Sequence, residues 1–106
     1  MMYSNLCDDE IERLAKLTEE CGEISQMVGK VLVHGWESTH PRKPEDGTNR
    51  ERLEKELGGL LCVMNLMCQR GDLSYDKIYD AETAKRKVIG KYLHHQYGLE
   101  AYEETN

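Results

Sequence analysis

The chain has 106 residues, enough for one domain with a modest hydrophobic core. Its formal net charge is -6, and its only run of three basic residues is Lys85-Arg86-Lys87. Such a chain is unsuited to tracking the backbone of polymeric nucleic acid. Hydrophobic residues make up 39% and charged residues 32%, with no Phe and few β-branched runs, which favours an all-α fold over residues 1–106.

The first expected helix runs from about Asp8 or Asp9, whose side chains can cap its amino end, to about Val33. His34 and Gly35 form the expected stop. At the helical period its apolar residues gather on one arc, which we expect to face the core: Leu17, Cys21, Ile24, Met27, Val28, Val31 and Leu32.

A carboxylate interrupts this apolar arc. Glu20 falls inside it, Glu23 lies at its edge one turn on, and Glu19 points away. Lys16, four residues before Glu20, is the obvious basic neighbour on the same face. Since a buried charge needs a partner, Glu20 and Glu23 are candidate ligands of a cation.

Residues from about 34 to 49 contain both prolines and several turn formers, so they predict one exposed loop. A loop this long in a small domain is either a functional lid or binding segment, or a disordered connector, and both interpretations remain open. Trp36 in this loop could stack on a nucleotide base or anchor the loop to the domain.

Thr48 or Asn49 can cap a second helix, which we expect from Arg50 to about Gln69. Glu56 borders its apolar stripe. That stripe consists of Leu53, Leu57, Leu60, Leu61, Met64, Met67 and Cys68. If the first two helices pack antiparallel, Glu56 can converge with Glu20 and Glu23. Three carboxylates in a partly dry site suit Mg²⁺ or Mn²⁺, although glutamates that are merely solvated or paired with lysines are the structural alternative.

A third helix is expected after Ser74, which can cap it. Its expected contacts are Ile78, Ala81, Val88, Ile89 and Tyr92. Lys85 and Arg86 on this helix could contact substrate phosphates or could simply be solvated. Residues from about 99 to 106 form an acidic tail that we expect to be frayed. Because a closed bundle usually takes four helices, three imply a homodimer or homotetramer.

The four cysteines match no zinc-binding spacing, and three of them lie on helical stripes, so we expect reduced, structural cysteines: Cys7, Cys21, Cys62 and Cys68. No apolar run approaches the roughly 20 residues that cross a membrane, and no signal peptide precedes the first helix. We therefore expect a cytoplasmic protein without a membrane partner.

The stretch LTEECGEISQ, followed by a helix containing EKELGGLL, resembles the MazG-like all-α nucleoside triphosphate pyrophosphohydrolases. The resemblance covers roughly Leu14 to Gln96, and the loop pattern HGW, HP and TNRE is similar to that of short phage and bacterial members. The family pattern E-E-x-x-E matches Glu19, Glu20 and Glu23, and Glu56 matches the first residue of its E-x-x-D. The resemblance implies an oligomeric helical bundle that uses magnesium to cleave nucleotides between the α and β phosphates.

The sequence departs from that pattern at one expected ligand, because Gly59 stands where the family has aspartate. Glycine can neither coordinate a cation nor orient water, and two successive glycines in a helix cost about 1 kcal/mol each relative to alanine.

We therefore expect a Mg²⁺-dependent hydrolase of nucleoside or deoxynucleoside triphosphates, with Glu20, Glu23 and Glu56 as metal ligands. Glu20 or Glu19 would accept the proton of the attacking water. Two alternatives remain: a nucleotide-binding homologue without catalysis, and a helical interaction module whose carboxylates pair across an interface.

Overall fold

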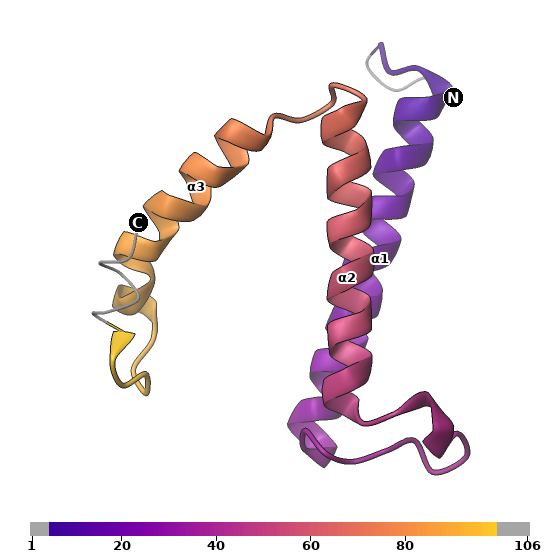
Figure 1. The fold of residues 1–106 in the computed structure, drawn as a ribbon, viewed down its shortest axis with the longest axis vertical. Helices are drawn as coiled ribbons and strands as arrows, with labels where there is room; N and C mark the ends of the chain where they lie inside the picture. The colour runs from indigo at the N-terminus through magenta and orange to yellow at the C-terminus, as the bar shows by residue number, and fades with distance from the viewer. Residues whose placement is uncertain (1–4, 100–106) are drawn as a thin grey trace. The chain divides into compact units, whose positions relative to one another are not determined.

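The computed structural model describes residues 5–99 and divides the chain into two compact units, one extending to Asp72 and the other beginning at Leu73. The first unit contains helix α1 (Asp8–His34), the 3-10 turn η1 (Pro44–Asp46) and helix α2 (Asn49–Gln69). The second contains helix α3 (Tyr75–Val88) and the 3-10 turn η2 (Ile89–Tyr92) (Figure 1). Within residues 5–99 the only β pairing is an isolated bridge between Thr39 and Thr48, so the all-α prediction is confirmed.

Helix α1 begins differently from the prediction. Cys7 occupies the N-cap position, and its backbone N–H donates to a carboxylate oxygen of Glu10 at 2.9 Å. Asp8 and Asp9 lie inside the first turn, where the helix dipole favours their negative charge, and the prediction that one of them caps the helix is wrong. The helix ends at His34, and Gly35 follows with φ 88°, which a residue without a Cβ adopts without strain.

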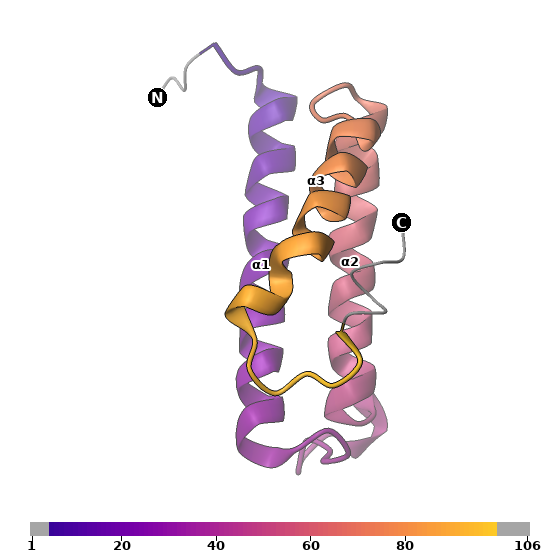
Figure 2. The same cartoon turned by 90° about the vertical axis from the view of Figure 1, so that its left-hand side faces the viewer.

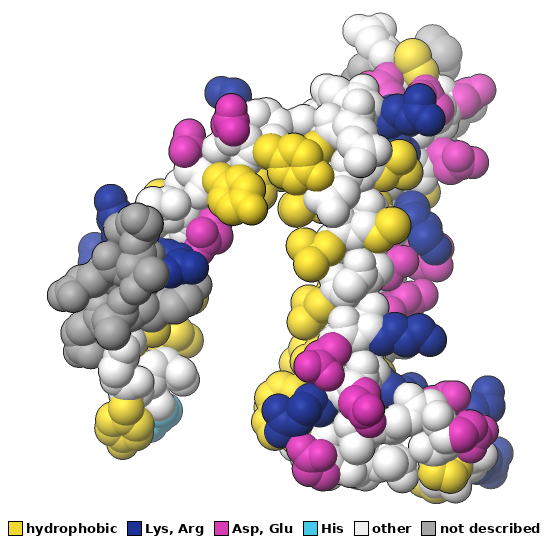
Figure 3. All heavy atoms as spheres, viewed as in Figure 1, with side chains coloured by type: hydrophobic (Ala, Val, Ile, Leu, Met, Phe, Trp, Pro, Cys, Tyr) yellow, Lys and Arg dark blue, Asp and Glu magenta, His cyan; other side chains and the backbone are white. Residues whose placement is uncertain are grey.

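The helices α1 and α2 run antiparallel and pack along most of their length (Figures 1 and 2). Their contact buries Met27 from α1 together with Val63 and Met67 from α2. The expected apolar faces are only partly covered in this chain, and Figure 3 shows hydrophobic side chains in a row along α2. The exposed members of those faces include Val28 (42%), Leu32 (81%), Leu57 (42%) and Leu61 (54%), together with Cys21.

The loop between α1 and α2 is folded against the ends of both helices. The Asn49 side chain is buried and donates to the carbonyl oxygens of Gly35 at 3.0 Å and Lys30 at 3.5 Å. The backbone N–H of Asn49 donates to Ser38 O at 2.8 Å, and that of Arg50 to Trp36 O at 2.9 Å. Helix α2 then starts with Thr48 as its cap, one of the two residues predicted for that role. The structure contains an ordered loop here, and not the disordered connector that was the second interpretation.

At the opposite end of the pair, a bidentate ion pair joins α1 to the turn after α2. Arg13 Nε lies 2.6 Å and Nη2 2.9 Å from the two carboxylate oxygens of Asp72, and the two side chains are only 10% and 13% exposed. The hydrogen bonds from Arg13 are the main reason that the pKa of Asp72 lies below its usual value. Paired, desolvated groups of this kind hold a fixed geometry.

In the second unit the Ser74 hydroxyl accepts a hydrogen bond from Lys77 N–H at 3.4 Å, so the predicted cap of α3 is confirmed. Ile78, Val88 and Ile89 are half-buried, whereas Ala81 and Tyr92, also expected among the contacts, are exposed, Tyr92 to 72%. Positions 100–106 of the predicted frayed tail lie outside the described residues.

Among the helices described for residues 5–99, none is both long and apolar enough to cross a membrane.

Replacing Asp72 with Asn should reduce the loss of thermal stability that the protein shows as the pH falls. Because the folded pKa of Asp72 is lowered, its contribution is complete above the unfolded pKa of about 3.9 and is lost as the pH falls through the folded value. Thermal melts between pH 2 and 7 should therefore show a shallower acid loss in Asp72→Asn than in the unmodified protein. Parallel profiles would contradict this account of the ion pair.

Removing the other partner tests the same contact at neutral pH. Arg13→Ala leaves Asp72 without its bidentate partner, which should lower the free energy of unfolding measured in urea more than the loss of a surface ion pair does. The matched control is Glu37→Gln, because Glu37 pairs with Arg50 on the surface and such pairs contribute about 0–1 kcal/mol. Equal losses in the two variants would contradict the prediction.

Candidate metal centre

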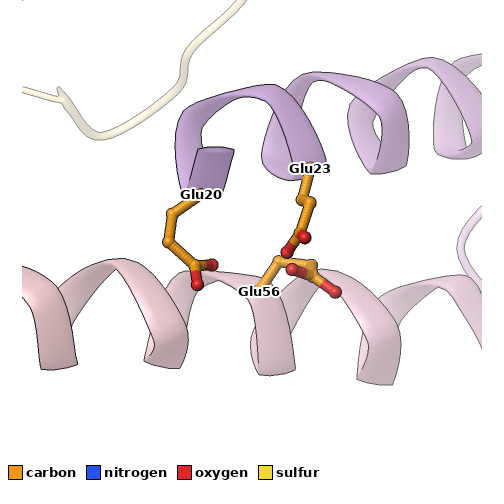
Figure 4. Close-up of side chains that lie close together, drawn as sticks. All are labelled: Glu20, Glu23 and Glu56. Carbon is orange, nitrogen blue, oxygen red and sulfur yellow. The ribbon is translucent and has the colours of Figure 1, made fainter. Parts of the chain in front are cut away.

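Three carboxylates meet between α1 and α2 (Figure 4). Glu20 and Glu23 come from successive turns of α1, and Glu56 comes from the facing side of α2. One oxygen of each lies within 4.8 Å of the others. Among residues 5–99 this is the one group of three or more potential ligands from His, Cys, Asp and Glu that converges in this way. The antiparallel packing proposed from the sequence therefore brings all three predicted ligands together.

Glu20 is the buried member of the group, with 8% of its surface exposed. Its closest cation is Lys16, whose Nζ lies 3.7 Å from Glu20 Oε1. The same ammonium group lies nearer to Glu19, at 3.1 Å. One lysine therefore serves two carboxylates, and the negative charge of Glu20 is only partly compensated.

The pKa of Glu23 is raised above its usual value, chiefly by the hydrogen-bonding contact with the Glu56 carboxyl group, and further by burial and by the charges of Glu56 and Glu19. Lys16 acts in the opposite direction but does not cancel these effects. Each of the first three causes disfavours the charged form of Glu23, so the cluster carries its negative charge at a cost in stability.

Gly59 belongs to the same site. A Cβ built on Gly59 would lie 2.7 Å from Glu20 Oε2 and 3.2 Å from its carboxyl carbon, closer than real Cβ atoms approach. The absence of a side chain at position 59 therefore makes room for the Glu20 carboxylate against α2. Gly58, by contrast, has nothing within 4 Å of its built Cβ. Position 59 therefore faces the Glu20 carboxylate.

The remaining predicted site residues lie outside the cluster. The Glu19 side chain is 55% exposed, bound to Lys16. Trp36 is 46% exposed, and the Arg50 guanidinium of α2 lies 4.8 Å from the centroid of its ring. This contact anchors the loop to α2. Lys85 and Arg86 belong to α3 in the second unit, where Arg86 Nε donates to Glu82 at 2.6 Å.

Two features of the site escaped the sequence prediction. The close packing of Glu20 on Gly59 could have been anticipated, because Gly59 lies three residues after Glu56 and so on the same face of α2. The raised pKa of Glu23 had no sequence signal, because it depends on the distance between the side chains of Glu23 and Glu56 on different helices.

The four cysteines are free in the structure.

The three carboxylates could hold a small divalent cation. At a Mg–O length of about 2.1 Å, the ligands of an octahedral Mg²⁺ ion lie roughly 3.0 Å apart when cis and 4.2 Å apart when trans, and at least two of three ligand pairs are cis. The three glutamates, at up to 4.8 Å, would therefore need to close by up to about 1.8 Å around the ion.

Searches with protein-family models, curated proteins and solved structures find no match to this chain.

Glu23→Gln should stabilise the protein when metal is absent. Because the folded pKa of Glu23 is raised, its stability contribution is present below the unfolded pKa of about 4.3 and is lost as the pH rises through the folded value. At pH 7.5 in a chelator, differential scanning fluorimetry should therefore give a higher melting temperature for Glu23→Gln than for the unmodified chain.

The matched control is Glu54→Gln, an exposed glutamate of α2 outside the cluster, which should melt like the unmodified protein. A lower melting temperature for Glu23→Gln in the chelator would contradict the unfavourable effect of Glu56 and burial on the charged form of Glu23.

Proposed function

We propose that this chain is a Mg²⁺-dependent nucleoside triphosphate pyrophosphohydrolase that releases a nucleoside monophosphate and pyrophosphate. The observation that carries the proposal is the convergence of Glu20, Glu23 and Glu56 in a seam where one lysine lies beside Glu20 and the pKa of Glu23 is raised by its contact with Glu56. A cluster of hard oxygen ligands short of positive charge suits Mg²⁺, which normally takes its further ligands from water and substrate phosphates. The resemblance of the helical motifs to MazG-like enzymes supports the same conclusion.

In this proposal Glu20, Glu23 and Glu56 hold the metal, with Mn²⁺ as a substitute. The bound ion would neutralise charge on the α-phosphate and polarise it toward attack. Water oxygen bonds to the α-phosphorus, the bond from that phosphorus to the bridging oxygen of the β-phosphate breaks, and pyrophosphate leaves. Glu20 accepts the proton of the water, since it is the buried member of the cluster, while Glu19 is held at the surface by Lys16.

An open pocket of about 420 Å³ lies on the same helix pair, although none of the three clustered carboxylates lines it. Its charged walls are Glu12, Arg13, Lys16 and Glu19, and its apolar walls are Ala15, Val63 and Leu66. Lys16 and Glu19 lie within about one turn of Glu20, and Val63 one turn after Gly59. A pocket with both apolar and charged walls at this place suits a nucleotide.

A second candidate function is nucleotide binding without hydrolysis, and Gly59 is the observation that favours it. The Glu20 carboxylate occupies the place into which a side chain at position 59 would project. The site therefore offers three carboxylates where the resembled family has four, and a metal bound here would keep more water.

The test is pyrophosphate release from each common ribo- and deoxynucleoside triphosphate with Mg²⁺ or Mn²⁺. Turnover should be lost in Glu20→Gln, because that variant removes a ligand and the proton acceptor together. Glu54→Gln, a surface change on α2, should keep full activity and serves as the control.

The same assay with Gly59→Asp separates the two candidates. Turnover only in Gly59→Asp would favour the nucleotide-binding function, with Glu20 displaced at the flexible end of its side chain. Turnover by the unmodified chain would show that three carboxylates suffice. No turnover by either protein would contradict the pyrophosphohydrolase proposal.

We also propose that the working form is a homodimer or homotetramer. Val28 and Leu32 on α1 and Leu57 and Leu61 on α2 are between 42% and 81% exposed, and each pair is spaced by one turn along one helix face. Uncovered apolar rows of this kind mark a protein interface. Sedimentation velocity should show an oligomer that Leu61→Asp dissociates, whereas a monomeric unmodified chain would contradict the proposal.

A further inference from the structure

A second pocket of the first unit lies where the loop meets the helix pair. It has a volume of about 260 Å³. Its walls are Lys30 and His34 from α1, residues 38–41 of the loop, and Asn49 and Arg52 from α2. None of these lining residues is acidic. The pocket therefore concentrates positive charge in a chain whose net charge is -6.

The two cations of the pocket have no carboxylate partner among residues 5–99. Neither Lys30 nor Arg52 forms an ion pair with any residue that the structure describes. By contrast, Arg13, Lys16, Arg50 and Arg86 each pair with at least one acidic side chain. Two unpaired cations on facing helices, with His34 and His40 beside them, would attract a multiply charged anion.

The wall of the pocket is already held in place by contacts within the protein. Asn49 is 3% exposed, and its side chain fastens the loop to Gly35 and Lys30. The isolated bridge between Thr39 and Thr48 closes the loop upon itself. Because these contacts already order the wall, binding of an anion would cost little conformational entropy.

An anion in this pocket would be bound by side chains and not by free backbone N–H groups. The first backbone N–H groups of α2 are occupied, with Arg50 N–H bonded to Trp36 O and Glu51 N–H bonded to the Thr48 hydroxyl. The positive end of the α2 dipole still adds to the attraction of an anion near its first turn. An Arg guanidinium can bind phosphate oxygens in bidentate fashion, and a Lys ammonium binds them as a point charge.

We propose that this pocket binds a small phosphate anion, for which inorganic pyrophosphate is the matching probe. The volume lies below the roughly 300–1,000 Å³ typical of sites for drug-sized ligands, so it suits a diphosphate group and not a whole nucleotide. Lys30 follows Glu23 by seven residues and Arg52 precedes Glu56 by four, so the helical rise puts the pocket about 6–10 Å along the helices from the carboxylates. The anion is thus either the terminal phosphates of a nucleotide at the metal centre or a separate phosphate ligand.

The direct test is isothermal titration of inorganic pyrophosphate into the metal-free protein in chelator. Saturable binding is expected, weakened at least about tenfold by Arg52→Gln and by Lys30→Gln. Lys55→Gln, which removes an exposed cation of α2 outside the pocket, should bind as the unmodified protein does. Circular dichroism melts of each variant establish that it is folded. Absence of binding, or equal binding by all four proteins, would overturn the proposal.

A second titration identifies the source of the anion. With Mg²⁺ present, pyrophosphate is titrated into protein saturated with a non-hydrolysable nucleoside triphosphate. Exclusion of pyrophosphate, together with weaker binding of the nucleotide by Arg52→Gln, would assign the pocket to the terminal phosphates of the substrate. Simultaneous binding would assign it to a separate phosphate ligand. The first titration contains no metal, so its outcome is independent of whether the carboxylates catalyse hydrolysis.

Discussion

The burial of Glu20 between two antiparallel helices is the constraint on which the first unit depends. A carboxylate that is 8% exposed has lost most of its water, and such a group is stable only beside a compensating charge or donor. Lys16 supplies part of this compensation from 3.7 Å and Gly59 supplies the space. On the neighbouring pair, the contact with Glu56 raises the pKa of Glu23 and so disfavours its charged form. The proposed metal-binding function would explain why so unfavourable a cluster lies in the helix seam.

Contacts at both ends hold α1 and α2 together, and the three clustered carboxylates lie between those contacts. Arg13 and Asp72 join the amino end of α1 to the turn that follows α2. Asn49 ties the end of α1 to the start of α2 through the loop. Fixing both ends sets the register of the two helices, and that register sets which residues face each other in the middle. The contacts that stabilise the fold are thus the ones that place Glu56 opposite Glu20 and Glu23.

The sequence predicted those features that follow from helical periodicity. The three helices, the Thr48 and Ser74 caps and the convergence of the glutamates all come from spacing along a single helix or from simple antiparallel packing. Periodicity could not predict which apolar residues are covered within one chain, so Leu32 and Leu61 proved exposed. The cap of α1 was missed because Cys7 holds that position through its backbone, with Glu10 as the acceptor. The loop fold depends on Asn49 reaching carbonyl groups 14 and 19 residues away, a long-range contact that local signals do not contain.

The most direct test of the central claim is a titration of Mn²⁺ followed by electron paramagnetic resonance, because free Mn²⁺ gives a strong signal that binding suppresses. The account predicts that the unmodified chain suppresses the signal at a saturable site and that Mg²⁺ restores it by competition. It also predicts loss of this site in Glu56→Gln and its retention in Glu54→Gln. Equal suppression by both variants, or none by the unmodified chain, would contradict the assignment of Glu20, Glu23 and Glu56 as a metal centre.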